Sequence, residues 1–167
     1  MKELPLHQFF LENLYNMKWV ESHVAEALAA MGSMALSERL HAAVHECIEK
    51  SLERASRLGE AIALLRETPL EIKCMAVPVM INETLANLSH GSYPAQIRDL
   101  VVIMGLQRIT AYQIASTTIL LAYSRSMGHP LTSQALTENI DGETASAEAL
   151  MDIVVHSTIP LALKEPA

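Results

Sequence analysis

Residues 10–31, FLENLYNMKWVESHVAEALAAM, carry the pattern that decides the fold. Apolar side chains recur there at alternating steps of four and three, and one acid shares their face. The positions are Phe10, Leu14, Met17, Glu21, Val24, Leu28 and Met31. This rhythm predicts a long helix that packs against other helices. An unpaired carboxylate on such a face costs about 3–5 kcal/mol, so Glu21 needs a cation, a metal ion or a proton.

A second acid interrupts the same rhythm near the other end of the chain. There the inward positions are Leu136, Ile140, Glu143, Ala147, Leu150 and Val154. The helix predicted after the first one carries a cation on its inward face, which reads Leu40, Val44, Cys47, Ser51, Arg54, Leu58, Ala61 and Leu65. A remaining long segment has Leu100, Met104, Gln107, Ala111, Ile114, Thr118 and Leu121 as its inward face. An inward Arg54 is suited to compensate Glu21 without any metal.

Turn residues divide the chain into four long helices and one short one. We expect long helices at about 5–31, 37–67, 95–127 and 132–156, and a short helix at 78–88. The two middle long helices are joined by one long crossing connection. The sequence therefore predicts an all-α, ferritin-like four-helix bundle with a short additional helix in that connection. We expect a single domain over residues 1–159 and a loose tail over 160–167.

Composition narrows the class of protein further. Half of the 167 residues are hydrophobic, only 4% are aromatic, and the net charge is −7 without a basic cluster. A nucleic-acid partner is therefore not expected, because phosphate binding needs grouped Lys and Arg. The start lacks the pattern of a signal peptide, and no apolar run is long enough to span a membrane. Two cysteines make no disulfide framework, so we expect a cytoplasmic location.

Three stretches resemble a known family. They are LHAAVHECIEKSLERASRLGEAIALLRETP (residues 40–69), IKCMA (72–76) and IMGLQRITAYQIASTTILLAYSRSMGH (103–129). In spacing, turns and apolar positions the chain resembles the bacterial YciE/YciF ferritin-like stress proteins from Leu6 to about Ile153. The resemblance implies a four-helix bundle of the diiron type and a homodimer. The chain would be a divergent member of that family.

The family's metal ligands are only partly present. The resemblance implies acids at Glu21 and Glu143, and both are kept. In the second helix, however, Lys50 stands where the family has an acid. Arg54 stands in place of a Gln or His, and Cys47 in place of a His. The third helix has Thr110, Ala111 and Gln113 where the family has two acids and a His, and Ala147 replaces an Asp. A dimetal site needs about four to six oxygen or imidazole ligands, which these positions do not supply.

Two hypotheses for the function follow. The first is a non-catalytic, ferritin-like bundle with a role related to stress. Its metal site would be replaced by a polar core of Glu21, Lys50, Arg54, Gln113 and Glu143. It would have no cofactor and would associate with itself or with a partner. The alternative is a diiron-type oxidase or iron-binding stress protein that uses Glu21 and Glu143 in an unusual ligand set, so enzymatic activity stays open. His41 and His45, with Glu49 one turn further, are a separate and weaker candidate for a metal ion.

The first hypothesis makes a geometric prediction. Because residues 21, 54 and 143 lie near the middle of their helices, Arg54 should point into the bundle and bond Glu21. Glu143 or Gln113 should complete the network, with Lys50 at its edge.

A homodimer should cover the apolar residues that lie off the inward faces. The candidates for this surface are Trp19, Phe9 and residues 79–88.

Overall fold

The computed structural model describes residues 5–164, and this part of the chain is helical with no strand. The elements are α1 (Pro5–Gly32), α2 (Glu38–Leu65), α3 (Ala76–His90), α4 (Ala95–Ser126), α5 (Pro130–Ile153), the π-helix η1 (Val154–Thr158) and α6 (Ile159–Ala162). The predicted helices are confirmed, with bounds that differ by a few residues. In this described part, no helix is both long and apolar enough to cross a membrane.

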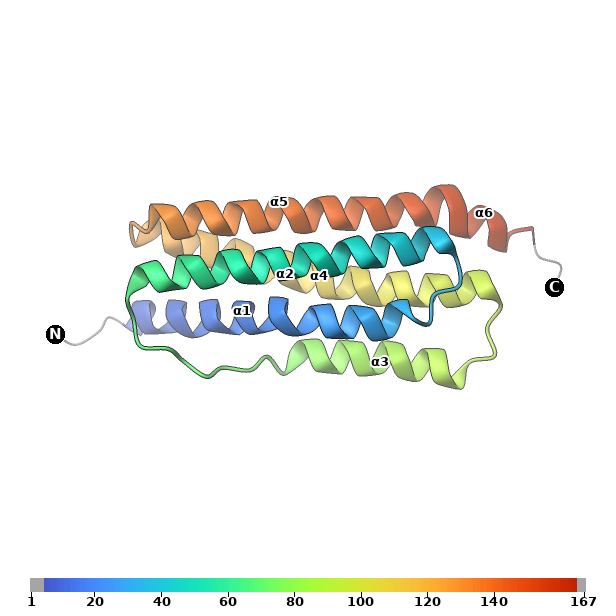
Figure 1. Ribbon diagram of the computed structural model, residues 1–167, viewed down its shortest axis with the longest axis horizontal. Helices are drawn as coiled ribbons and strands as arrows, with labels where there is room; N and C mark the ends of the chain where they lie inside the picture. The colour runs from blue at the N-terminus through green and yellow to red at the C-terminus, as the bar shows by residue number, and fades with distance from the viewer. Residues whose placement is uncertain (1–4, 165–167) are drawn as a thin grey trace.

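The four long helices form a bundle in which α1 packs on α2 and α4, and α5 packs on α4 and α2. Short turns make α1 antiparallel to α2 and α4 antiparallel to α5 (Figure 1). Between these pairs, the segment that contains α3 carries the chain back along the whole bundle. As a result α2 and α4 run in the same direction, which is the arrangement of a bundle with one long crossover.

A buried carboxylate fastens the turn between α1 and α2. Asp99, near the start of α4, is 4% exposed and accepts hydrogen bonds from the backbone N–H groups of Leu36 and Ser37, at 2.7 and 3.1 Å. The Ser37 hydroxyl in turn accepts from the Leu40 N–H as the N-cap of α2. These bonds satisfy N–H groups that a helix start leaves free, and they tie both helix pairs together at this end.

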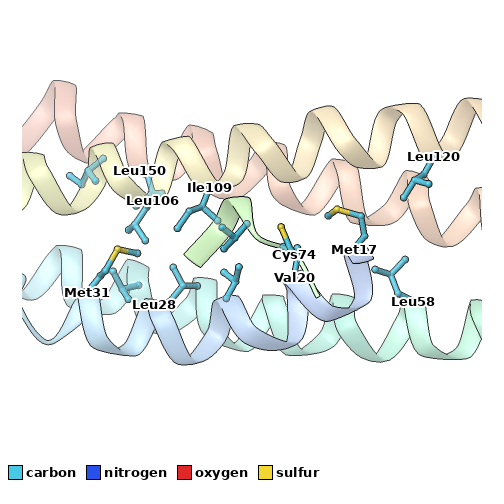
Figure 2. Packing of buried hydrophobic residues seen from close by; sticks show 14 of the residues in the cluster. Met17, Val20, Leu28, Met31, Leu58, Cys74, Leu106, Ile109, Leu120 and Leu150 are labelled. Atoms are coloured by element: carbon cyan, nitrogen blue, oxygen red, sulfur yellow. The ribbon is translucent and has the colours of Figure 1, made fainter. Parts of the chain in front are cut away.

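The inward face expected for the first helix is confirmed at every position, including Glu21. The apolar members of that face pack against leucine and isoleucine side chains of α4 and α5. Figure 2 shows Met17, Leu28 and Met31 of α1 pointing into the space between the helices, with Leu106 and Ile109 of α4 opposite. On α2 the expected face is buried except at Cys47 and Leu65, which are half-buried.

The inward face expected for the 95–127 helix is wrong by about one position. Met104, Ala111 and Thr118 are exposed, while the buried residues of α4 include Val102, Ile103, Leu106, Ile109, Thr110, Gln113, Thr117 and Leu120. The cause is that α4 contacts α1, α3 and α5, so apolar residues occur on most of its circumference. Because such a helix has no single apolar stripe, the sequence pattern does not predict how the helix is rotated about its own axis. On α5 the expected Leu136, Glu143 and Leu150 are buried, whereas the expected Ile140, Ala147 and Val154 are half-buried and Asn139, Ser146 and Ile153 are buried beside them.

The C-terminal end also differs from the expectation. The chain does not become loose at Pro160, because η1 and α6 continue the helical path of α5 to Ala162. Pro160 lies in the first turn of α6, directly after the π-helical turn, and does not end the helical path. Thr158 is buried at the end of η1 and donates a hydrogen bond to the Ile153 carbonyl at 3.3 Å. Residues 165–167 of the expected tail lie outside the described part.

Candidate functional site

Three charged side chains meet inside the bundle. Glu21 of α1, Arg54 of α2 and Glu143 of α5 are 1%, 4% and 2% exposed. Each lies near the middle of its helix and on the face that packs against the other helices. Residues that occupy the same layer of a bundle are brought together by the packing itself. The structure thus places one guanidinium between two carboxylates.

The distances make Arg54 the centre of this cluster. Its Nε atom lies 3.1 Å from Glu21 Oε2 and 2.7 Å from Glu143 Oε1. Ser51, one turn earlier on α2, has its hydroxyl 3.0 Å from Glu21 Oε2 and 2.9 Å from the Glu21 carbonyl. Glu21 is therefore held by both a charge and a hydroxyl donor. This is the kind of pairing that a buried carboxylate requires.

The two carboxylates are not bound in the same way. An Nε atom carries a single hydrogen, and here Arg54 donates it to Glu21. Glu143 Oε1 lies 2.7 Å from the same nitrogen but receives no hydrogen bond from the described residues, so Glu143 is less firmly bound than Glu21. Arg54 Nη1 and Gln113 Nε2 are also buried, and neither has a hydrogen-bond partner among residues 5–164. Arg54, Gln113 and Glu143 line one cavity of about 10 Å³.

Glu143 is neutralised by a proton. Burial raises its pKa, the negative charge of Glu21 raises it further, and the attraction of Arg54 only partly offsets them, which leaves the pKa at about 9. At neutral pH Glu143 is then an uncharged acid beside the Glu21–Arg54 ion pair. The cluster carries no net charge in this state, because one cation balances one carboxylate. A neutral cluster avoids the large cost of burying an uncompensated ion.

The structure places the two other predicted members differently. Gln113 of α4 is 1% exposed and lines the cavity beside Arg54 and Glu143, without a direct hydrogen bond to either. Lys50 does not reach the network, so its expected place at the edge is not the observed one. Its ammonium pairs with Glu46 one turn earlier on α2, and its side chain is 38% exposed. An ammonium on a flexible stem loses less solvation at the surface than beside a second buried cation.

Sequence reasoning missed some polar residues that surround the cluster. Ser51 was recognised as inward but not as a donor to Glu21. Asn139 of α5 is 1% exposed, accepts a hydrogen bond from Arg57 at 2.6 Å and has its amide nitrogen 3.5 Å from the Arg54 carbonyl. It lies one turn before Glu143, which is the spacing that places two residues on one helix face. That spacing was the available signal.

Cys47 borders the same cavity, one helical turn from Ser51. Burial raises the pKa of its thiol above the ordinary value, an effect that the positive charge of Arg54 only partly offsets. A thiol with a raised pKa is a poor nucleophile and a poor metal ligand, because the thiolate is the reactive form. Cys47 is thus a small, half-buried packing residue, and within the described residues both cysteines are free.

The donor set does not fit a dimetal centre. Across residues 5–164, no group of three or more His, Cys, Asp or Glu side chains is placed to hold a metal ion. Glu21 and Glu143 supply two carboxylates, but a guanidinium lies within 3.1 Å of both and would repel a divalent cation. His41 and His45 are exposed on α2, and His45 lies 3.7 Å from Glu49. These surface residues do not form a cluster of ligands either.

Fold and site together define a class: helical bundles of four long helices with a short helix in the crossover and a charged cluster at mid-bundle. The chain belongs to the family described as domain of unknown function DUF892, whose model matches residues 5–160. It is 23% identical to protein YciF of Escherichia coli K12 over 160 residues, which covers 94% of this chain and 95% of that protein. The resemblance to the YciE/YciF family is thereby confirmed.

Solved structures show the same fold. The E. coli stress protein YciF superposes with a TM-score of 0.83 at 24% identity, covering 99% of this chain and 100% of that one. YcfI of Rhodopseudomonas palustris, named as a candidate structural protein, gives a TM-score of 0.84 at 21% identity and covers 90% and 95%. A protein of Xanthomonas campestris gives 0.69 at 17% identity and covers 95% and 99%. At these identities the likeness concerns the fold alone.

Proposed function

We propose that this chain is a non-catalytic, ferritin-like member of its family, in which a guanidinium and a proton do the structural work that metal ions would do between carboxylates. One observation carries the proposal. Arg54 Nε lies 3.1 Å from Glu21 and 2.7 Å from Glu143, at the point where a bridging cation would have to bind. A role as a cytoplasmic stress-related protein is consistent with the description of the E. coli relative as a stress protein.

The chemistry of the cluster supports this role. A catalytic dimetal site needs open coordination positions and several oxygen or imidazole ligands. Here one carboxylate is engaged by Arg54 and Ser51, and the other is protonated at neutral pH. A protonated carboxylic acid is a poor ligand for a cation. The cluster is therefore suited to joining α1, α2 and α5 at mid-bundle rather than to redox chemistry.

Metal content is the direct test. Protein purified without chelators should contain far less than one iron or zinc per chain by elemental analysis. It should also show no saturable heat of binding when titrated anaerobically with Fe(II). The variant Arg54→His replaces the guanidinium with an imidazole between the two carboxylates, so it should bind Zn(II) or Fe(II) more tightly than the wild type.

The alternative of an iron-binding oxidase makes the opposite prediction. Near-stoichiometric iron in the wild type, with oxidised-diiron absorption bands that disappear in Glu143→Gln, would overturn the proposal. Iron that persists unchanged in both Glu21→Gln and Glu143→Gln would indicate surface binding, for example at His41 and His45. That result would leave the mid-bundle cluster metal-free, as proposed.

A further inference from the structure

A groove outside the charged cluster follows the outer side of α1 and is bounded by the crossing segment. Two hollows form it, of about 500 and 330 Å³. The first lies between α1 and residues 69–73, and the second lies between α1 and the start of α3. Both are lined by Trp19 and His23, so they adjoin at this pair. We call residues 15–27 of α1 together with residues 69–82 the crossover groove (Figure 1 shows the two segments side by side).

The floor of the groove at its centre is aromatic. The rings of Trp19 and His23 are stacked, with centroids 3.9 Å apart and planes inclined by 16°. Trp19 is half-buried rather than exposed, which differs from its expected place on a dimer surface. Leu70 and Ile72 of the crossing segment are also half-buried and line the first hollow. Flat aromatic and apolar side chains of this kind accept a planar apolar group.

Two cations line the first hollow. Lys18 of α1 and Lys73 of the crossing segment both border it, with one acid, Glu71. Within residues 5–164, neither lysine forms an ion pair with a carboxylate. The first hollow therefore has one positive charge in excess, in a chain whose net charge is −7, whereas the second hollow is lined by Glu26 and by no Lys or Arg. Charge of this sign favours an acidic group on the ligand.

The crossing segment has the freedom to admit a ligand. Residues 67–74 have no regular secondary structure and make no backbone–backbone hydrogen bond within the described part of the chain. A segment with few such bonds opens at a lower free-energy cost than a packed helix. The opposite wall, α1, is fixed by its buried face in the core. One rigid wall and one adaptable wall describe a site that can close on a small molecule.

We propose that the crossover groove binds a small amphipathic anion, with a planar apolar body against Trp19 and His23 and an acidic group near Lys18 and Lys73. The hollow volumes lie in the range of about 300–1,000 Å³ that is typical of small-molecule sites. This binding does not depend on whether the mid-bundle cluster holds a metal. It would make the protein a carrier or sensor of such a compound.

Trp19 is the only tryptophan of the chain, so its fluorescence reports on the groove directly. The probes are 1-naphthalenesulfonate, the uncharged 1-naphthalenemethanol and inorganic phosphate. The sulfonate should change the Trp19 emission in a saturable way and bind at least tenfold more tightly than the alcohol. Phosphate should cause no change, because it lacks the apolar body.

Charge variants test the position of the acidic group. Lys18→Gln and Lys73→Gln should each weaken sulfonate binding about three- to tenfold, whereas Lys164→Gln removes an exposed lysine outside the groove and should leave it unchanged. Added salt should weaken sulfonate binding to the wild type more than sulfonate binding to a variant that combines Lys18→Gln and Lys73→Gln. Equal affinity of wild type and both groove variants, or equal binding of the alcohol and the sulfonate, would overturn the proposal. So would an unchanged Trp19 emission at saturating sulfonate.

Discussion

At the scale of single residues, the central feature is that two buried acids are compensated in different ways. Glu21 receives the Arg54 N–H and the Ser51 hydroxyl, whereas Glu143 has a pKa raised to about 9 by burial and by the charge of Glu21. Removing one partner of a buried ion pair leaves the other charge in a poorly solvated place. The residue-scale predictions follow from that asymmetry.

Arg54→Ala should lower the free energy of unfolding by about 3–5 kcal/mol, because it leaves the Glu21 carboxylate without its cation. Urea denaturation followed by circular dichroism measures the change. Arg108→Ala is the matched control: Arg108 pairs with Glu83 at 3.2 Å on the exposed surface, so its loss should cost about 1 kcal/mol or less. The combined variant Arg54→Met with Glu21→Gln should lose less than Arg54→Ala. An equal or greater loss would mean that packing, and not stranded charge, explains the effect.

Stability should fall as the pH rises from about 4.5 to about 9. The folded protein keeps the Glu143 proton up to its raised pKa, whereas the unfolded chain releases it near the ordinary value of 4.5. In that window the folded state binds more protons, so raising the pH favours unfolding, with a slope of up to about 1.4 kcal/mol per pH unit. The stability that the Glu143 proton contributes is fully present below about pH 4.5 and is lost progressively as the pH rises to about 9.

Glu143→Gln preserves the shape of the side chain and removes the titration. Its unfolding free energy should vary less between pH 5 and pH 9 than that of the wild type, measured by urea denaturation at each pH. Glu138→Gln, on the exposed side of the same helix, serves as the control and should keep the wild-type slope. Parallel pH profiles of wild type and Glu143→Gln would show that Glu143 is already ionised at neutral pH.

At the scale of the helices, close approach decides how α3 sits on α4. Gly105 of α4 faces Thr84 of α3, and a Cβ on Gly105 would lie 2.4 Å from Thr84 Oγ1 and 3.0 Å from Thr84 Cβ. Thr84 is 2% exposed and donates to the Met80 carbonyl, so it cannot move away freely. Gly142 of α5 is different, since its Cβ would meet only Arg54 Nη1 at 3.8 Å. Close packing against α3 therefore requires a glycine at position 105, whereas the space around position 142 would admit an alanine.

Gly105→Ala should therefore destabilise the protein by about 1–3 kcal/mol through overpacking, although alanine is the better helix former. Gly142→Ala should stabilise it by about 0.5–1 kcal/mol, because the same gain in helix propensity meets no clash. Thermal unfolding of the two variants side by side measures both effects. A stabilised Gly105→Ala variant would show that α3 can shift away from α4 at little cost.

At the scale of the whole molecule, α3 covers only part of the seam between α1 and α4. Farther along that seam Phe9 and Ile119 are 49% and 55% exposed, beside Tyr123 and a hollow of about 200 Å³. Val79 on the outer side of α3 is also exposed, as expected, whereas Leu88 of the same helix is buried. An apolar patch of this kind is typical of a surface that another chain covers. We propose that a second copy of the chain covers it.

Light scattering at micromolar concentration should then give a molar mass of twice the chain mass of 18.3 kDa. Ile119→Lys, which places a charge in the patch, should shift the mass toward the monomer. Leu52→Lys is the control, since Leu52 is 53% exposed on α2, away from the seam of α1 and α4. A monomeric wild type would contradict the homodimer, and equal effects of the two variants would exclude this patch as the interface.

The sequence by itself determined the helices, the turns between them and the presence of charge on three inward faces. The reason is that periodicity is a local property: residues three and four apart share a face wherever the helix lies. It was sufficient for α1, whose one face is buried, and it placed Glu21, Arg54 and Glu143 inside the bundle. It failed for α4, because a helix with neighbours on three sides shows no single stripe.

Only the tertiary structure decided how those charges are compensated. Whether Arg54 or Lys50 reaches Glu21 depends on side-chain directions to within an ångström, and Lys50 turned to Glu46 at the surface. The proton on Glu143 depends on the distance to Glu21 and on the loss of water around both, which are properties of the assembled layer. The crossover groove likewise joins residues some fifty positions apart, so no local pattern could indicate it. Long-range packing brings such groups together, and the sequence encodes it only through the whole fold.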